Sequence, residues 1–231
     1  LLCELAADRG LAVDMHCDES DDPLSRHIET LAFHARRLGL HGRVTGSHLT
    51  SMHSMDNYYV SKLIPLMCEA GVHAVANPLI NITLQGRHDS YPKRRGMTRV
   101  PELMAAGVNV AFGHDCVMDP WYALGSGDML EVAAMGLHVA QMTSQAGMKA
   151  CFDAVTVNAA RVLGLEDYGL DVGCRADFVL LQARSPVEAI RLRAQRLLVV
   201  RGGTVIARAP ASATELHLPG RPAHVDFTRL G

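Results

Sequence analysis

The sequence predicts an α/β fold in which parallel strands alternate with helices. Between residues 11 and 115, four apolar strand candidates alternate with helical patterns that end at glycines. Polar residues stand at the carboxyl ends of the four strands: His16, His48, Asn77 and Asp115. Barrels of parallel strands build their sites from such strand ends, and the chain has no Gly-rich phosphate-binding turn of the kind that favours a doubly wound sheet. We therefore favour a (β/α)8 barrel, of which this chain supplies four strands.

Each element follows from a local pattern. Residues 1–9 resemble the second half of an amphipathic helix, so we expect the sequence to begin within a domain. Strands are expected where an apolar run ends in polar residues, at 11–17, 42–48, 72–79 and 108–115. Helices are expected where apolar residues recur at helical spacing before a glycine, at 25–38, 59–70 and 98–106. Residues 81–96 are polar and weakly periodic, which predicts a long loop.

The pattern changes in the last third of the chain. Two further helices are expected at 128–142 and 148–163. Beyond them, residues 174–182 and 196–208 are rich in β-branched residues, and RGGT forms a hairpin-like turn within the second run. We place a domain boundary near residue 164, which gives segments 1–163 and 164–231.

Composition excludes several classes of partner. The 231 residues carry 22 basic and 24 acidic side chains, for a net charge of -2, which favours neither nucleic acid nor a membrane surface. No apolar run approaches the ~20 residues of a spanning helix, and no signal pattern opens the chain. The six cysteines form no Cys-x-x-Cys pair, which argues against a zinc knuckle and suits a reducing compartment. We expect a soluble cytoplasmic protein.

Three strand-end residues, His16, His48 and Asp115, are the candidates for a metal site. A lone histidine at such a place is more often a structural hydrogen-bonding residue, and a lone aspartate is more often a helix cap. Their repetition at successive strand ends favours a divalent metal, for which imidazole and carboxylate are suitable ligands. Glu19 follows in the motif DMHCDE and could shuttle protons, although an exposed loop acid is the simpler interpretation of that residue alone.

The chain carries, in this order, the motifs DMHCDE, SHLTSMHS, NPLINITLQGRHDSYPKRRGMTRV and FGHDCVMDPWYALG. In order and spacing, across nearly the whole chain, they resemble the motifs of the bacterial cytosine deaminases of the amidohydrolase superfamily. TVNAARVLGL followed by DVGCRADFVLL resembles the superfamily's C-terminal signature, where the last barrel helix leads into a small β-sandwich. The resemblance implies the second half of a distorted (β/α)8 barrel, strands five to eight, in residues 1–163. It implies the C-terminal part of the β-sandwich and a tail in 164–231.

The resemblance also implies roles for individual residues. His16 and Asp115 would bind one divalent metal ion, Fe2+ or Zn2+, and Asp115 would accept the proton of the attacking water. His48 would hydrogen-bond the resulting hydroxide, and Glu19 would carry a proton to a ring nitrogen. Trp121 would line the substrate pocket. The expected reaction is hydrolytic deamination of a free pyrimidine base, cytosine to uracil and ammonia, by an enzyme that tends to form homo-oligomers. His53 and the basic run 93–95 receive no role and are expected to be solvated.

Two features depart from the cytosine deaminase pattern. The superfamily's His-x-His motif, on the first barrel strand, does not occur in these residues. We therefore expect the N-terminal half of the same protein to supply the missing ligands, and this chain alone to be inactive. Cys116 replaces the second aspartate of the pattern at the pocket edge. A small neutral thiol could admit a C5 substituent, so 5-methylcytosine to thymine is an alternative to neutral drift.

Two other functions remain open. The same fold and metal site also serve aminohydrolases of s-triazine or creatinine-like heterocycles, which differ in their pocket residues. A function of another class is a catalytically incompetent fragment or scaffold. Product analysis on a panel of heterocycles distinguishes the enzymes, and metal content distinguishes the scaffold.

Overall fold

The structure, a computed structural model, describes residues 1–225. The chain divides into two units, Leu1–Glu166 and Asp167–Gly231. The division lies close to the boundary that we place near residue 164. Within the described residues, no helix is both long enough and apolar enough to cross a membrane.

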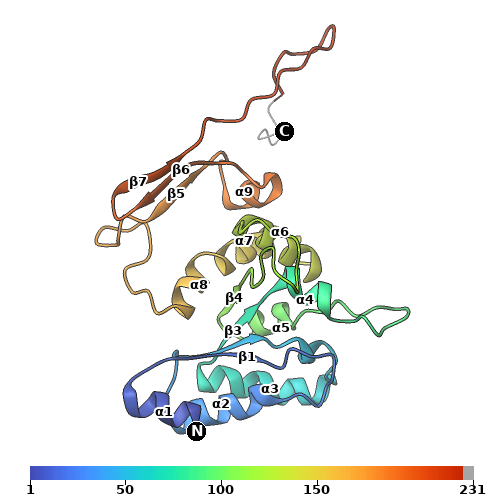
Figure 1. The fold of residues 1–231 in the computed structure, drawn as a ribbon, viewed down its shortest axis with the longest axis vertical. Coiled ribbons are helices and arrows are strands. Elements are labelled where there is room, and N and C mark those ends of the chain that lie inside the picture. Colours follow the sequence, from blue (N-terminus) through green and yellow to red (C-terminus); the bar gives the residue numbers. More distant parts are fainter. Residues whose placement is uncertain (226–231) are drawn as a thin grey trace. The chain divides into compact units, whose positions relative to one another are not determined.

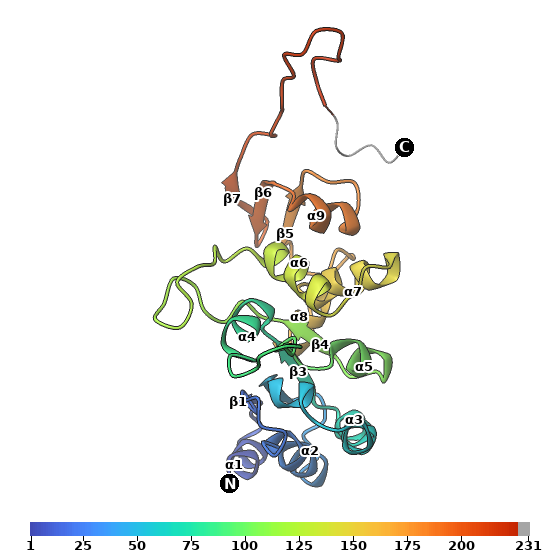
Figure 2. The ribbon, with the colours of Figure 1, turned by 90° about the vertical axis from the view of Figure 1, so that its right-hand side faces the viewer.

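The first unit is built on a parallel sheet whose four strands follow one another in chain order (Figure 1). These strands are β1 (Val13–Cys17), β2 (Val44–His48), β3 (His73–Ala76) and β4 (Val110–Phe112). The helices are α1 (Leu2–Arg9), α2 (His27–Arg37), α3 (Asn57–Ala70), α4 (Pro78–Leu84), α5 (Val100–Ala105), α6 (Met129–Val139), α7 (Gln145–Ala154) and α8 (Val157–Val162), with a 3-10 helix, η1, at Thr50–His53. Figures 1 and 2 both show α1, α2 and α3 together on one side of β1. This is the predicted arrangement of a partial (β/α)8 barrel.

The core of this unit lies between the sheet and its helices. Every residue of β2 is buried, as is typical of a parallel strand covered on both faces. Ile28 of α2 and Leu49 after β2 are fully buried against it. A Cβ atom added at Gly46 would lie 2.9 Å from Cδ1 of Ile28 and 3.0 Å from Cδ2 of Leu49. A larger residue at this position would force the Ile28 and Leu49 side chains to shift on the strand that ends at His48.

Three local predictions in this unit were wrong. The third strand, expected at 72–79, ends at Ala76, and α4 occupies the start of the expected loop at 81–96. Pro78 explains the early change, because proline cannot donate to a sheet ladder but suits the first turn of a helix. The helix expected at 148–163 is divided into α7 and α8, which are separated at Thr156, where ψ is -98°.

The second unit contains an antiparallel sheet with the strand order β5–β6–β7. Its elements are β5 (Phe178–Leu181), α9 (Pro186–Leu192), β6 (Arg196–Arg201) and β7 (Thr204–Arg208). Gly202 and Gly203 connect β6 to β7 with φ of 54° and 76°, the conformation that tight hairpins require and that glycine adopts readily. The β-rich ending and its hairpin are therefore as predicted, whereas α9 had not been predicted.

Candidate functional site

The predicted site residues come together at the carboxyl edge of the parallel sheet. His48 is the last residue of β2 and lies opposite Cys17, so His16 is one position away across the β1–β2 pair. Asp115 follows β4 by three residues. Because parallel strands end at the same edge, loops that are far apart in the sequence reach a common point.

Two buried asparagines fix the proton position on His48. Nδ2 of Asn81 lies 2.9 Å from Nδ1 of His48, and Nδ2 of Asn77 lies 3.3 Å from the same atom. The Asn81 amide is oriented by its Oδ1, which accepts the backbone N–H of Asn77 at 3.1 Å. Nδ1 of His48 therefore accepts, and the neutral ring carries its proton on Nε2. Both asparagines are buried, which excludes water as a competing partner.

The protonated nitrogen of His48 faces the two predicted metal ligands. Nε2 lies 3.1 Å from Nδ1 of His16 and 3.9 Å from Oδ1 of Asp115. Burial lowers the pKa of His48 to about 4, with Asp115 opposing this shift and His16 adding to it. His48 is therefore neutral near pH 7, and its Nε2–H is a fixed donor in the centre of the site.

Glu19 completes the cluster on the other side of His48. Its Oε1 lies 3.4 Å from Nδ1 of His48. Burial raises the pKa of Glu19, and the nearby charge of Asp115 raises it further, while His16 acts in the opposite direction. A carboxyl group that holds its proton more tightly than usual is suited to accept a proton and then deliver it.

The donor atoms of this cluster fit a divalent metal ion. Among the described residues, ligand atoms of His16, Glu19 and His48 all lie within 4.8 Å of one another. His48 is the least suitable of the three, because its Nδ1 is engaged by amides and its Nε2 carries the proton. His16 and Asp115 offer an imidazole nitrogen and a carboxylate oxygen, the donor types that borderline metals prefer. The chain can thus supply part of a metal coordination shell.

Cys116 and Trp121 lie on the loop that follows β4. The Cys116 thiol donates to Oδ2 of Asp115 at 3.4 Å. Burial raises the pKa of Cys116 to about 12, and Asp119 and Asp115 contribute to the increase, so the thiol is neutral. Asp119 accepts the backbone N–H of Trp121, whose side chain remains 67% exposed. The role of Trp121 in a substrate pocket stays a prediction.

The backbone is strained where these side chains enter the site. His48, Leu49 and Asp115 have φ of 73°, 53° and 64°, in the left-handed region that residues other than glycine rarely adopt. Asp18, next to Glu19, has a φ of 55°. Such conformations cluster at functional sites, where surrounding contacts hold them in place.

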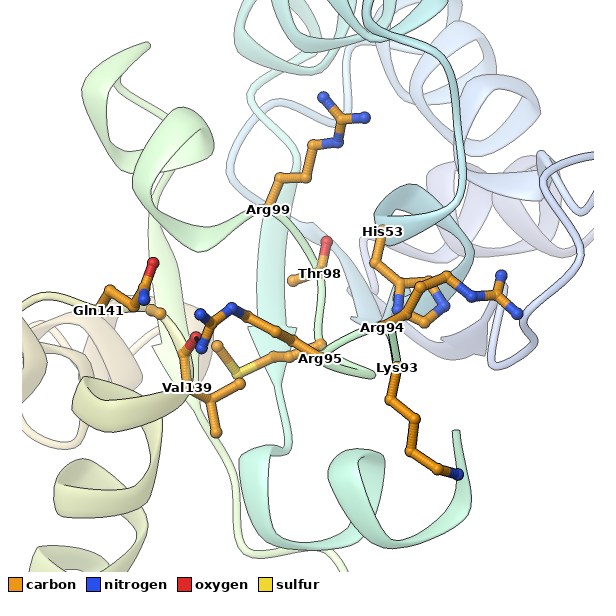
Figure 3. A pocket seen from close by; sticks show the side chains of 10 residues that line it. His53, Lys93, Arg94, Arg95, Thr98, Arg99, Val139 and Gln141 are labelled. Carbon is orange, nitrogen blue, oxygen red and sulfur yellow. Dashed lines mark hydrogen bonds between the residues drawn. The ribbon is translucent and has the colours of Figure 1, made fainter. Parts of the chain in front are cut away.

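Sequence reasoning missed several residues that organise the site. Asn81 was given no role, although its spacing of four from Asn77 after a strand is a usable signal. His53 was expected to be solvated, but its side chain is only 6% exposed. The basic run 93–95 is exposed, as expected, and it lines a cavity of about 350 Å³ together with His53 (Figure 3).

Comparisons with known proteins agree with this geometry. Residues 2–207 match the profile of the Amidohydrolase family. The crystal structure of 5-methylcytosine deaminase from Klebsiella pneumoniae, liganded with 5-fluorocytosine, superposes with a TM-score of 0.90 at 44% identity, covering 95% of this chain and 53% of that one. N-isopropylammelide isopropylaminohydrolase from Burkholderia multivorans gives a TM-score of 0.76 at 30% identity, covering 89% and 49%. Pterin deaminase of Rhizobium rhizogenes is 35% identical over 217 residues, 93% of this chain and 49% of its own length. The chain thus spans about half the length of these relatives.

Proposed function

The chain belongs to the amidohydrolase family, and from this membership we propose that it supplies strands five to eight of the barrel of a hydrolytic deaminase that acts on a free pyrimidine base. The observation that carries the proposal is the buried, neutral His48, whose Nε2–H faces His16 and Asp115. A donor held between a candidate ligand pair and a carboxyl group with a raised pKa suits the addition of water to a ring carbon.

His16 and Asp115 would hold one divalent metal ion, Fe2+ or Zn2+, with further ligands from the other half of the barrel. Bound there, the ion would supply Lewis-acid activation of the attacking water. A carboxylate oxygen of Asp115 accepts a proton from that water. The Nε2–H of His48 orients the attacking oxygen, and Glu19 delivers a proton to the ring nitrogen beside the reacting carbon. Asp115 then passes the proton that it accepted to the exocyclic amine, which leaves as ammonia. The proton of the newly formed hydroxyl on the reacting carbon returns to Glu19 as the carbonyl forms, so cytosine and water give uracil and ammonia and both carboxyl groups regain their starting protonation states.

Cys116 favours a substrate with a substituent at C5. The neutral thiol sits beside Asp115, where an ionised aspartate would hold water and repel a methyl group. The relative at 44% identity, whose name specifies 5-methylcytosine, supports the same choice. One methyl contact is worth about 10- to 200-fold in kcat/KM. We therefore propose 5-methylcytosine, giving thymine, as the better substrate.

To test this substrate, the release of ammonia by the complete deaminase is compared for five compounds. They are cytosine, 5-methylcytosine, an amino-s-triazine, a creatinine-like heterocycle and pterin. We expect the two pyrimidines to be turned over and 5-methylcytosine to be preferred, with Cys116→Asp reversing the preference. Cys68→Asp, at a half-exposed thiol of α3, is the control for adding a carboxylate elsewhere. Turnover confined to triazine or pterin would favour the other heterocycles.

We also propose that activity requires the N-terminal half of a complete amidohydrolase barrel and that the complete protein forms a homo-oligomer. The 231-residue chain alone should retain little metal after gel filtration. Co-expression with the N-terminal half of the Klebsiella pneumoniae relative should restore both metal content and turnover. A metal-free complex without turnover would favour a scaffold.

A further inference from the structure

His53 is buried at the meeting point of loops that follow three different strands. Its Nε2 lies 2.9 Å from Oδ1 of Asp21, on the loop after β1. Its Nδ1 accepts the backbone N–H of Gly96 at 3.1 Å, on the segment after α4. A backbone N–H can only donate, so Nδ1 is unprotonated and Nε2 carries the proton toward Asp21. The two nitrogens of one ring thus join two loops.

Asp21 is bound by the same segment a second time. Both of its carboxylate oxygens accept the backbone N–H of Gly86, at 3.1 and 2.8 Å. Arg94 donates to the backbone carbonyl of Asp21 at 3.0 Å and to the hydroxyl of Ser54. Oδ1 and Oδ2 of Asp89 hold the Arg94 guanidinium at 2.6 and 2.8 Å. The loop after β1 is therefore fastened to residues 86–96 by side-chain and backbone contacts together.

The three residues of the basic run, 93–95, make different contacts. In Figure 3 Arg95 extends toward Val139, whose carbonyl it reaches at 3.3 Å, and Lys93 extends away from the His53 ring. Lys93 donates to the carbonyl of Gly86 at 3.1 Å. The charged groups of Arg95 and Lys93 point in different directions, so they do not form a common anion site. Arg94 is the member of the run that joins the loop after β1.

Glu19 lies between two anchors of its loop. Upstream, the Asp18 carboxylate accepts the backbone N–H groups of His27 and Ile28, each at 2.8 Å. The backbone carbonyl of Asp18 also accepts the N–H of Ser51 at 2.9 Å. Downstream, Asp21 is the anchor, and only Glu19 and Ser20 lie between the two. The position of the Glu19 carboxyl group therefore depends on both ends of a very short span.

We propose that His53, with Asp21, Gly86, Arg94 and Gly96, forms a clasp that positions Glu19 for proton transfer. His53 is a positioning residue, because it acts through Asp21 and does not reach the cluster of His16, His48 and Asp115. This inference rests on the proposed function, since it assigns the clasp to the loop of the proton-carrying residue.

Two substitutions separate the two bonds of the His53 ring. In His53→Gln the longer amide can still donate to Asp21, but it has no acceptor where Nδ1 received Gly96. In His53→Asn the amide oxygen takes the place of Nδ1 and accepts Gly96, but no donor reaches Asp21. His53→Phe removes both bonds while filling the buried space. His88→Phe, at an exposed position of the same segment, is the control.

The first readout is hydrogen exchange, which does not depend on turnover. In the 231-residue chain, amides of residues 18–24 should exchange at least tenfold faster in His53→Asn and His53→Phe than in His53→Gln. Amides of residues 94–97 should show the reverse order for the two amide variants. Unchanged exchange of residues 18–24 in His53→Phe would overturn the clasp whether or not the protein is a deaminase.

The second readout is kinetic and uses the complete, metal-loaded deaminase. A displaced proton carrier lowers kcat by about 10- to 100-fold without a matching change in KM. We expect that loss in His53→Asn and His53→Phe, and a loss below about fivefold in His53→Gln and His88→Phe. Equal losses in the Asn and Gln variants, or a rise in KM alone, would refute a role for the Asp21 bond. Wild-type protein without turnover would contradict the proposed function and leave the exchange result as the measure of the clasp.

Discussion

Asn81→Asp is the substitution that examines the proton position on His48 most directly. Nδ2 of Asn81 donates to Nδ1 of His48 at 2.9 Å, and both residues are fully buried. An ionised aspartate presents only acceptors, while its second oxygen can still receive the N–H of Asn77. The proton of His48 should therefore move from Nε2 to Nδ1, leaving a lone pair directed at His16 and Asp115.

The magnitude follows from the role of the lost donor. A correctly placed acid or base contributes about 10²- to 10⁴-fold to the rate. At 1.36 kcal/mol per tenfold, this corresponds to roughly 2.7 to 5.4 kcal/mol in activation free energy. We expect kcat of the complete deaminase to fall by this factor, with little change in KM, because Asn81 is fully buried and acts through His48.

The assay combines steady-state kinetics with 15N NMR of the histidine rings at pH 8, where the chemical shifts distinguish the two tautomers. Asn109→Asp is the matched control. Nδ2 of Asn109 lies 3.1 Å from Nδ1 of His73, at the start of β3 and therefore at the other end of a strand from the site. It should alter the His73 ring while kcat stays within a fewfold of wild type. A native His48 tautomer in Asn81→Asp, or an equal loss of kcat in the control, would refute this reasoning.

Three further outcomes are expected from calorimetry and denaturant unfolding. Gly46→Ala should lower the free energy of unfolding by about 1 to 3 kcal/mol through overpacking. Adding Ile28→Val should suppress much of that loss, because it removes the Cδ1 methyl group that lies 2.9 Å from a Cβ atom at position 46. Additive effects of the two substitutions would argue against the close approach. Asp18→Ala should cost about 1 to 2 kcal/mol, since two N–H groups at the start of α2 lose their acceptor, and a change below 0.3 kcal/mol would contradict the anchor. Burial lowers the pKa of His53 below its usual 6.5, so its contribution to stability is present above about pH 6.5 and is lost as the pH falls and the unfolded chain takes up the proton first. His53→Gln should therefore flatten the acid side of the stability profile, and an unchanged slope would show that the ring does not titrate in this way.

Periodicity and glycine positions were sufficient to predict the four parallel strands, because burial of both faces of a parallel sheet leaves long apolar runs. The change at Pro78 was missed because an apolar run of this length suits a buried strand or a short helix equally well. α9 was missed for a related reason. Its start is held by a pair of hydrogen bonds, from the backbone N–H of Glu188 to the Ser185 hydroxyl and from the backbone N–H of Arg184 to the Glu188 carboxylate, within a segment too short to show helical periodicity.

The candidate site was predictable to the extent that its residues lie directly at strand ends. His16, His48 and Asp115 do so, and the sheet brings them together. Residues that act through another side chain leave no comparable pattern. Asn81 affects His48 from within a helix, where its spacing of four from Asn77 is the one sequence signal. His53 affects Asp21 across 32 positions of sequence, which no local pattern indicates.

The left-handed backbone at Asp115 has a consequence for which residues can occupy this position. Holding an aspartate in this conformation costs roughly 1 kcal/mol or more relative to glycine, which adopts it without strain. Replacing Asp115 by glycine would relieve that strain and would also remove the carboxylate. The backbone conformation and the proposed metal ligand therefore make opposing demands on one residue.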